Sequence, residues 1–239
     1  MIDSIYDVAS GLDAFIKNQE VIARNIANAN TVGFKKSVVD FSIILEEVNG
    51  VEKENIQAEI GINFSEGNLE YTGNSLDIAI DGEGFFTIET EQGLRYTRNG
   101  QFKLSDSGEI VTLSGGKLLG TGGTIFVPKS GGEITIDSKG IVKAGNTVIG
   151  ELLITNFNQL SVLTPTGEGL FEVPLAAMQD LAEANFKIAQ GYLERSNVNV
   201  ALEMIDMIAN MRSYEASSQI IKSLSESTEQ LISNQLNSV

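Results

Sequence analysis

A helical repeat of apolar residues occupies both ends of this chain and is missing from the glycine-rich region between them. In residues 2–30 and 199–236, apolar side chains recur at alternating steps of four and three, which places each set on one face of a helix. No other long amphipathic segment could cover both faces, so we expect them to pack against neighbouring molecules. The residues predicted to make this packing are Ile5, Leu12, Ile16, Ile26, Val200, Met204, Met207, Met211, Tyr214 and Ile221.

The middle of the chain has the pattern of a compact antiparallel β domain. Apolar and polar residues alternate there, and glycine-containing turn signals recur mostly every five to nine residues. This pattern predicts a central β domain over residues 74–171. Residues 36–73 and 172–198 are predicted to be extended connections, and residues 1–35 and 199–239 a terminal helical domain.

The composition argues against several classes of function. The 239 residues include 16 basic and 32 acidic side chains, and the net charge of −16 repels phosphate backbones, so nucleic acid is a poor partner. The chain has no cysteine and no histidine, so we expect neither a catalytic triad built on them nor an ordinary zinc site. We expect no cofactor and no metal.

Carboxylates are the remaining candidates for catalysis. Asp77, Asp81 and Glu83 lie close together in the sequence, and paired carboxylates can perform acid–base chemistry. Asp81 and Glu83 alternate with Gly82 and Gly84 at an expected turn between strands, so solvated turn residues are the favoured interpretation. An acid hydrolase that uses Asp81 and Glu83 is an alternative hypothesis.

The N-terminal segment does not have the pattern of a secretory signal. It lacks a basic region, and Asp7, Asp13 and Lys17 interrupt its apolar residues. No run of about 18 apolar residues occurs, so we expect no membrane insertion. A cytosolic protein fits these observations, and so does one exported without a cleaved signal.

Three stretches of the sequence together resemble the flagellar rod and hook family of bacterial axial proteins. They are residues 25–35, residues 67–86 with their continuation 95–102, and residues 191–199 with the Glu203-Met204 and Arg212-Ser213-Tyr214-Glu215 that follow. They occur in the family's order and cover about half of the chain, including both ends. The signature residues are Asn25, Asn28, Thr31, Gly33, Phe34, Lys35, Asn74, Asp77, Gly82, Gly84, Phe85, Phe86, Gly191, Glu194, Ser196, Asn197 and Asn199.

The resemblance implies a structural subunit and not an enzyme. It implies an α+β fold, with the N- and C-terminal helices paired as a coiled-coil-like domain and an all-β central domain. Such a subunit would stack helically into the periplasmic rod of the flagellar basal body, with its helices around the export channel, and would transmit torque. The implied partners are copies of itself, other rod subunits, the hook protein and the flagellar type III export apparatus, which needs no cleaved signal.

Within the family, the sequence is somewhat more similar to the proximal-rod type than to the distal-rod type. Residues 134–152 resemble the second β stretch of the proximal type, and residues 46–62 lack the longer insertion of the distal type. Ser75 and Ala216 depart from the family pattern. A coiled-coil-bearing β-domain binding module is the alternative from another class of function.

A hinge is predicted where the first helix ends. Its residues are Asn28, Thr31, Gly33, Phe34 and Lys35, with Gly33 in a positive-φ conformation that alanine adopts only at a cost. An ordinary helix stop is the equally favoured alternative.

Overall fold

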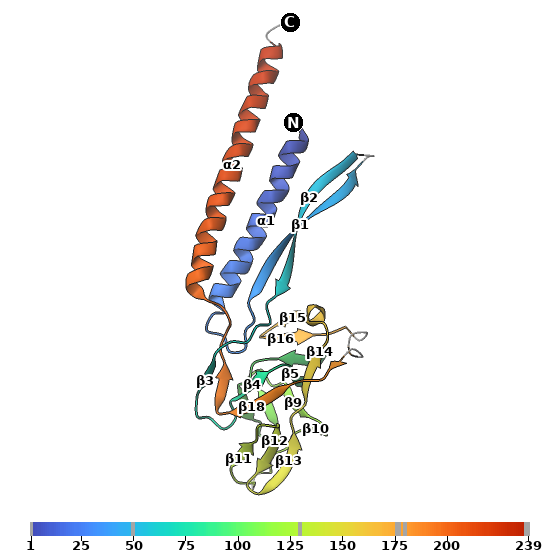
Figure 1. Cartoon of the computed structure of the whole chain (residues 1–239), viewed down its shortest axis with the longest axis vertical. Coiled ribbons are helices and arrows are strands. Elements are labelled where there is room, and N and C mark those ends of the chain that lie inside the picture. The colour runs from blue at the N-terminus through green and yellow to red at the C-terminus, as the bar shows by residue number, and fades with distance from the viewer. Residues whose placement is uncertain (1, 49–50, 129–130, 175–177, 179–180, 237–239) are drawn as a thin grey trace. The chain divides into compact units, whose positions relative to one another are not determined.

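The computed structural model describes residues 2–48, 51–128, 131–174, 178 and 181–236 (Figure 1). Within them, helix α1 runs from Ile2 to Ala27 and helix α2 from Val200 to Leu236. Neither helix combines the length and the apolar character needed to cross a membrane in its described part.

The chain divides into two compact units. The first, which we call the terminal unit, comprises Met1–Ala27, Ser37–Asn63 and Val198–Val239. The second, the β body, comprises Asn28–Lys36 and Phe64–Asn197. Both units are therefore built from segments that lie far apart in the sequence.

The terminal unit combines the two helices with a long β-hairpin. Strands β1 (Ser37–Val48) and β2 (Val51–Ile62) pair antiparallel along their whole length, in a register that sets Ser37 opposite Ile62. Helix α1 contacts α2 and both strands of the hairpin (Figure 1). Val21 and Ile22 of α1 are 2% and 4% exposed, so α1 supplies the core of this unit.

The predicted fold class is wrong in its helical part. We expected an α+β fold with a coiled-coil-like domain of paired terminal helices. Strands instead make up 41% of the chain, with one helix at each end, and such a paired domain is not shown. The hairpin contacts α1 as α2 does, so the terminal unit is not a purely helical structure.

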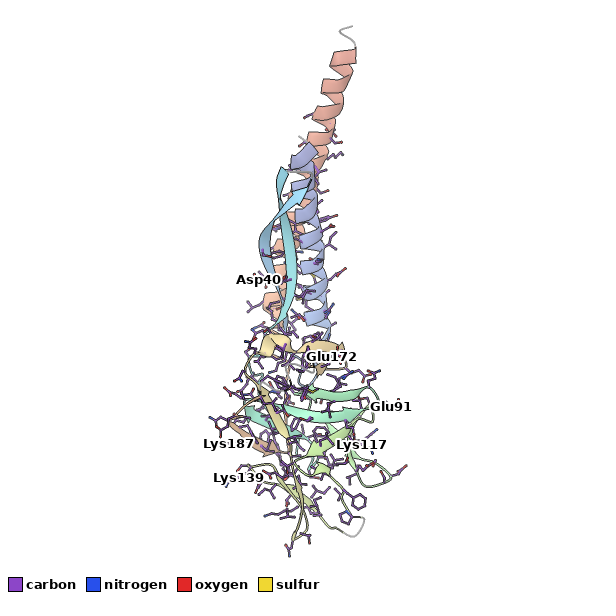
Figure 2. All side chains as sticks on the ribbon, turned by 90° about the vertical axis from the view of Figure 1, so that its right-hand side faces the viewer. Asp40, Glu91, Lys117, Lys139, Glu172 and Lys187 are labelled. Atoms are coloured by element: carbon purple, nitrogen blue, oxygen red, sulfur yellow. The ribbon has the colours of Figure 1, made fainter. Side chains whose placement is uncertain are left out.

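The hairpin was hard to predict because its strands lack the usual alternation of apolar and polar residues. Ile43, Ile44 and Leu45 follow one another in β1. Asp40, which is labelled in Figure 2, lies opposite Glu59 in the register. Like charges in directly opposite positions weaken a strand pair, so the sequence pattern did not favour this pairing.

The strand pairings in the described part of the β body are antiparallel, as the glycine-rich pattern predicts. Its largest sheet has the order β15-β16-β6-β5-β9-β8-β7, with β10 beside β9, β14 beside β5 and β17 beside β14. A second sheet has the order β11-β12-β13, and two ribbons are formed by β18 with β4 and by β19 with β3. The strands are β3 (Leu69–Tyr71), β4 (Ile78–Gly82), β5 (Phe85–Thr90), β6 (Gly93–Thr97), β7 (Phe102–Leu104), β8 (Ile110–Thr112), β9 (Lys117–Gly120), β10 (Gly123–Thr124), β11 (Ile134–Ile136), β12 (Ile141–Ala144), β13 (Thr147–Glu151), β14 (Ile154–Phe157), β15 (Thr164–Gly167), β16 (Leu170–Glu172), β17 (Leu181–Ala182), β18 (Phe186–Gln190) and β19 (Tyr192–Glu194), with a short 3-10 helix at Leu160–Val162.

An apolar core holds the β body together. Ile78, Ile80, Phe86, Ile88 and Leu118 are each at most 1% exposed and belong to one cluster of buried side chains. The segment that contains β18 and β19 completes the β body, because β18 pairs with β4 and β19 pairs with β3. Residues that follow the central strands by about a hundred positions therefore complete the body.

Candidate functional site

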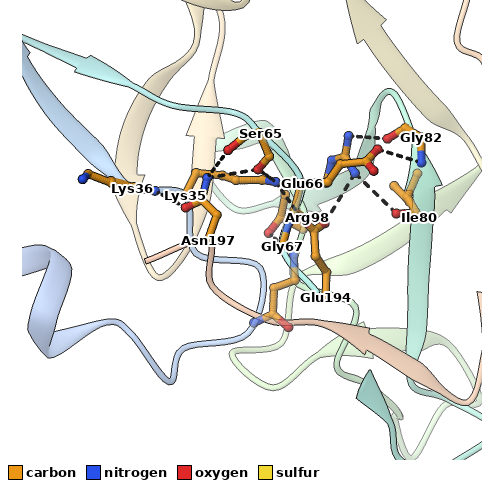
Figure 3. A network of polar contacts seen from close by, with 12 residues as sticks. Lys35, Lys36, Ser65, Glu66, Gly67, Ile80, Gly82, Arg98, Glu194 and Asn197 are labelled. Carbon is orange, nitrogen blue, oxygen red and sulfur yellow. Dashed lines mark hydrogen bonds and ion pairs between the residues drawn. The ribbon is translucent and has the colours of Figure 1, made fainter. Parts of the chain in front are cut away.

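A buried ionic cluster joins four segments of the β body that lie far apart in the sequence (Figure 3). The carboxylate of Glu194, whose side chain is 1% exposed, accepts a hydrogen bond from Lys35 Nζ at 2.6 Å. The same Oε1 atom accepts one from the backbone N–H of Gly67 at 2.9 Å, and Oε2 lies 3.4 Å from Nη1 of Arg98. We call these four residues the ionic clamp.

Arg98 also makes contacts outside the ionic clamp. Its side chain is 5% exposed, and its Nη2 donates a hydrogen bond to the carbonyl oxygen of Gly82 at 2.8 Å. Its guanidinium carbon lies 5.3 Å from the centroid of the Phe85 ring, in a cation–π contact. Burial lowers the pKa of Arg98, and the neighbouring Glu194 acts in the opposite direction.

Lys35 is the second buried cation of the ionic clamp. Besides its pair with Glu194, its Nζ donates a hydrogen bond to the carbonyl oxygen of Ser65 at 2.8 Å. Burial lowers the pKa of Lys35, while the Coulombic attraction of Glu194 raises it. One carboxylate therefore compensates two buried cations, and removing it would leave both without their main counter-charge.

Gly33 lies against the backbone that carries Arg98. Its φ of +68° confirms the positive-φ prediction, and its N–H donates a hydrogen bond of 2.7 Å to the carbonyl oxygen of Glu194. A Cβ atom at this position would lie 2.4 Å from the backbone nitrogen of Asn99. Glycine is required here by both backbone conformation and space. The hinge itself stays a prediction.

Neighbouring signature residues form further hydrogen bonds between the segments that carry Lys35, Gly67 and Glu194. Asn197 accepts a hydrogen bond from the Lys36 N–H at 2.7 Å and donates one to the Ser65 carbonyl at 3.0 Å. Thr31 donates to the side chain of Asn28 at 3.1 Å. The half-buried Phe34 and Ser196 lie in the two segments that these bonds hold.

A second group of signature residues forms a local polar cluster at the start of the central β region. Asp77, which is buried, accepts hydrogen bonds from Thr72 at 2.7 Å and from the side chain of Asn74 at 3.1 Å. Its backbone carbonyl accepts the N–H of Gly191 at 2.8 Å. The carboxylate of Asp77 therefore holds the local turn, while the backbone of the same residue binds the segment at Gly191.

The remaining signature residues of the β body lie around the turn between β4 and β5. Gly82 ends β4, Gly84 lies in the turn, and Phe85 and Phe86 begin β5. The two phenylalanines are at most 1% exposed, with Phe86 in the main core and Phe85 packed edge-on against Phe64 at 5.6 Å between ring centroids.

In the terminal unit, Asn25 connects α1 to its neighbours. Its side chain is 1% exposed, and its Nδ2 donates to the carbonyl oxygen of Ser37 at 2.8 Å and to Glu203 at 3.0 Å. Asn199 caps α2, because its Oδ1 accepts backbone N–H groups of the first turn at 3.1 and 3.3 Å.

The face that α2 turns toward α1 is unexpectedly polar. The side chain of Asn210 is 6% exposed and donates hydrogen bonds to the carbonyl oxygen of Phe15 at 2.9 Å and to Gln19 at 2.8 Å. Asn18 donates to Asn210 at 3.0 Å. The contact between the helices thus uses the amides of Asn18 and Asn210, which lie off the predicted apolar faces.

The predicted packing residues are mostly left exposed by this arrangement. Exposed fractions are 44% for Ile16, 40% for Val200, 55% for Met204, 50% for Met211 and 38% for Tyr214. Those that are half-buried are Leu12, Ile26, Met207 and Ile221. The side chain of Ile5 lies outside the described residues.

Helix α2 also exposes apolar residues that are not among the predicted packing residues. Leu202, Ile205, Ile208 and Ile220 are 52–61% exposed and lie off the predicted face. An apolar helix surface that extends around most of the helix is typical of a helix that is buried by neighbours. We call the exposed apolar side chains of α1 and α2 the helical surface.

The comparisons with known proteins agree with this architecture. A family model described as "Flagella basal body rod protein" matches residues 5–35, and one described as "Flagellar basal body rod FlgEFG protein C-terminal" matches residues 189–234. A third, "Flagellar hook protein FlgE/F/G D1 domain", matches residues 79–144. The fold and these matches define an axial protein of the bacterial flagellum.

Similarity to individual relatives extends over nearly the whole chain. The chain is 36% identical to the flagellar basal-body rod protein FlgG of Agrobacterium fabrum over 249 residues, covering 91% of this chain and 94% of the relative. It is 34% identical to FlgG of Bacillus subtilis over 264 residues (97% and 98%) and 30% identical to FlgF of Mesorhizobium japonicum over 238 residues (97% and 97%). The chain belongs to the flagellar basal-body rod protein family and is a structural subunit of the rod in the basal body.

Replacement of the central carboxylate tests the ionic clamp. We expect Glu194→Gln to lower the free energy of unfolding of the β body by about 3–5 kcal/mol, because Lys35 and Arg98 lose their shared counter-charge. Denaturant unfolding followed by circular dichroism would measure this loss. Glu70→Gln is the control, since Glu70 pairs with Arg195 on the surface, and it should change stability little. Equal effects of the two changes would contradict the clamp.

Substitution of Gly33 tests the close approach of its backbone to that of Asn99. Gly33→Ala should destabilise the β body by about 1–3 kcal/mol, because its Cβ would meet the backbone of Asn99 and its positive φ disfavours alanine. Gly122→Ala is the matched control, since a Cβ there meets nothing within 4 Å. If thermal unfolding showed both variants to be as stable as the wild type, the requirement for glycine at position 33 would be wrong.

Proposed function

We propose that the subunit polymerises with copies of itself and with other rod subunits through the helical surface. The observation that supports this most is the exposure of Leu202, Met204, Ile205, Ile208 and Met211, each at least 50% exposed on one helix. Burying a side chain of this size contributes about 1.5–3 kcal/mol. A few such contacts per neighbour suffice for stable stacking, even after the entropy cost of association.

The same arrangement supports a subunit without catalytic activity. The relatives named above are rod proteins, which favours a structural role over the carboxylate hydrolase. Glu83 of the proposed acid pair accepts a hydrogen bond from Asn156 at 3.0 Å. The binding-module alternative is disfavoured, because the relatives match the chain over nearly its whole length.

The helices are proposed to line the export channel of the periplasmic rod, and the β body to form its outer layer. In such a rod, torque must pass through the segments that link the two units of each subunit. The ionic clamp holds residues next to three of these links, at Lys35, Gly67 and Glu194, and so suits the transmission of load. Passage through the flagellar type III apparatus and contact with the hook protein complete this proposal.

We infer that the subunit is of the proximal-rod type, with the distal-rod type as the second candidate. The lack of a long insertion supports this inference. The alignment with B. subtilis FlgG extends over 264 positions, more than the 239 residues of this chain, so that relative carries residues that this chain lacks. The alignment with M. japonicum FlgF spans 238 positions.

Charged substitutions on the helical surface test its role in polymerisation. Met204→Asp or Ile16→Asp should block incorporation into rods and abolish motility, because a carboxylate would be buried among apolar side chains. Circular dichroism of the purified variant should show an intact β body. Ser213→Asp adds the same charge at an exposed polar position of α2 and is the control. Normal motility of the Met204 and Ile16 variants would contradict the proposal.

The place of the protein in the cell is tested by mass spectrometry of detergent-extracted hook–basal bodies. The chain should be present in stoichiometric amount, and its deletion should remove the rod distal to its position. Rods in which the proximal segment itself is incomplete would support the proximal type, whereas rods that keep the proximal segment and lack only the distal one would support the distal type. Intact rods in the deletion strain would overturn the proposal.

A further inference from the structure

A cavity of about 420 Å³ lies in the β body beside the ionic clamp. Its lining combines the segment after β2, the turn between β4 and β5, and the end of β14. Phe64, Phe85 and Phe157 give it an aromatic wall, with ring centroids 5.6 Å apart for Phe64 and Phe85 and 6.4 Å apart for Phe85 and Phe157. Such a wall of ring faces and edges can accommodate the aliphatic stem and charged head of a cationic side chain.

Two carboxylates stand at the rim of this cavity. Glu66 and Glu83 are both exposed, and each uses one oxygen within the β body. Glu66 accepts the N–H of Gly82 at 2.8 Å, and Glu83 accepts the amide of Asn156 at 3.0 Å. Among the described residues, the second oxygen of each carboxylate has no hydrogen-bond donor. The rim can therefore accept hydrogen bonds from an incoming cation.

The charges around the cavity do not balance. Lys35 and Arg98 supply two positive charges, whereas Glu194, Glu66 and Glu83 supply three negative ones. Glu194, Glu66 and Glu83 all act on Arg98, which places them in one electrostatic cluster. The cluster carries one negative charge in excess, and a single cation from outside would neutralise it.

The β body itself carries suitable cations. Its arginines Arg95, Arg98 and Arg195 are already paired with glutamates. In the described part of the chain, Lys139 and Lys187 form no ion pair, and both are exposed on the β body (Figure 2). A lysine of a second copy is thus the available complement for the acidic cavity.

We propose that this cavity is a contact site between subunits, in which Glu66 and Glu83 bind a lysine side chain of a second copy of the chain. The contact joins two different patches, an acidic cavity and a lysine, so it is heterologous. Heterologous contacts that do not close into a ring repeat from copy to copy and generate a helical filament. The inference rests on the proposed polymerisation and adds a contact of the β bodies to the packing of the helices.

Zero-length cross-linking tests the proposal on the full chain. A carbodiimide joins a carboxylate to an amine only where the two are in contact, and a mixture of 14N- and 15N-labelled copies distinguishes links between molecules from links within one. We expect amide links from Glu66 or Glu83 of one copy to a lysine of the other. Associated copies without such links would overturn the proposal.

The matched variants are Glu66→Gln/Glu83→Gln and the control Glu89→Gln/Glu91→Gln, which removes two exposed carboxylates elsewhere on the β body. In sedimentation velocity at low salt, the cavity variant should associate roughly three- to tenfold more weakly than the wild type, and the control within about twofold of it. Added salt should weaken the association of the wild type until it approaches that of the cavity variant.

The outcomes separate this proposal from the helical surface. If Met204→Asp abolishes association while the cavity variant associates as tightly as its control, polymerisation through the helices stands and the cavity inference is wrong. If the wild type does not associate at all, both are wrong. Circular dichroism of each variant confirms that a change in association does not come from unfolding.

Discussion

The β body depends on the interactions that the buried carboxylate of Glu194 makes with groups from distant parts of the chain. This carboxylate receives Lys35 from the segment after α1, the N–H of Gly67 from the segment after the hairpin, and Arg98 from the body itself. Each of these groups would be costly to bury alone, and together they are compensated. The segments of the β body that adjoin the terminal unit in the sequence are therefore held by charge, whereas the sheets of the β body are held by apolar packing.

The two units divide their side chains in opposite ways. The β body encloses its apolar residues, such as Ile80 and Phe86, and places ionic groups at its clamp. The terminal unit encloses amides, with Asn210 and Asn25 between its elements, and exposes methionine and isoleucine on α2. Methionine adapts to several packing environments, which suits a helix that meets more than one neighbour. The first pattern is typical of a finished domain, and the second of a part of an assembly.

Much of the β body could be predicted, because alternation and glycine turns are local signals. The helical ends were also predictable as elements, but their contacts were not. Apolar residues at alternating steps of four and three mark only one face of α2. Leu202, Ile205 and Ile208 lie off that face, so they were not predicted as packing residues. Arg98 was missed as a site residue because an arginine before a turn is usually solvated, and its burial depends on Glu194, 96 positions away. The sequence pattern did not indicate the pairing of the hairpin for a related reason, since this pairing places Asp40 opposite Glu59.

The separation of Lys35 from Glu194, 159 positions along the chain, has a consequence for how each copy folds. Contacts between residues so far apart carry a large loop-closure cost and form late. Strands β18 and β19 belong to the same late set, since they complete ribbons begun by β4 and β3. A chain that arrives from its N-terminus thus cannot close its body until almost all of it has arrived. The β body of each copy therefore closes only once the chain is free as far as Glu194.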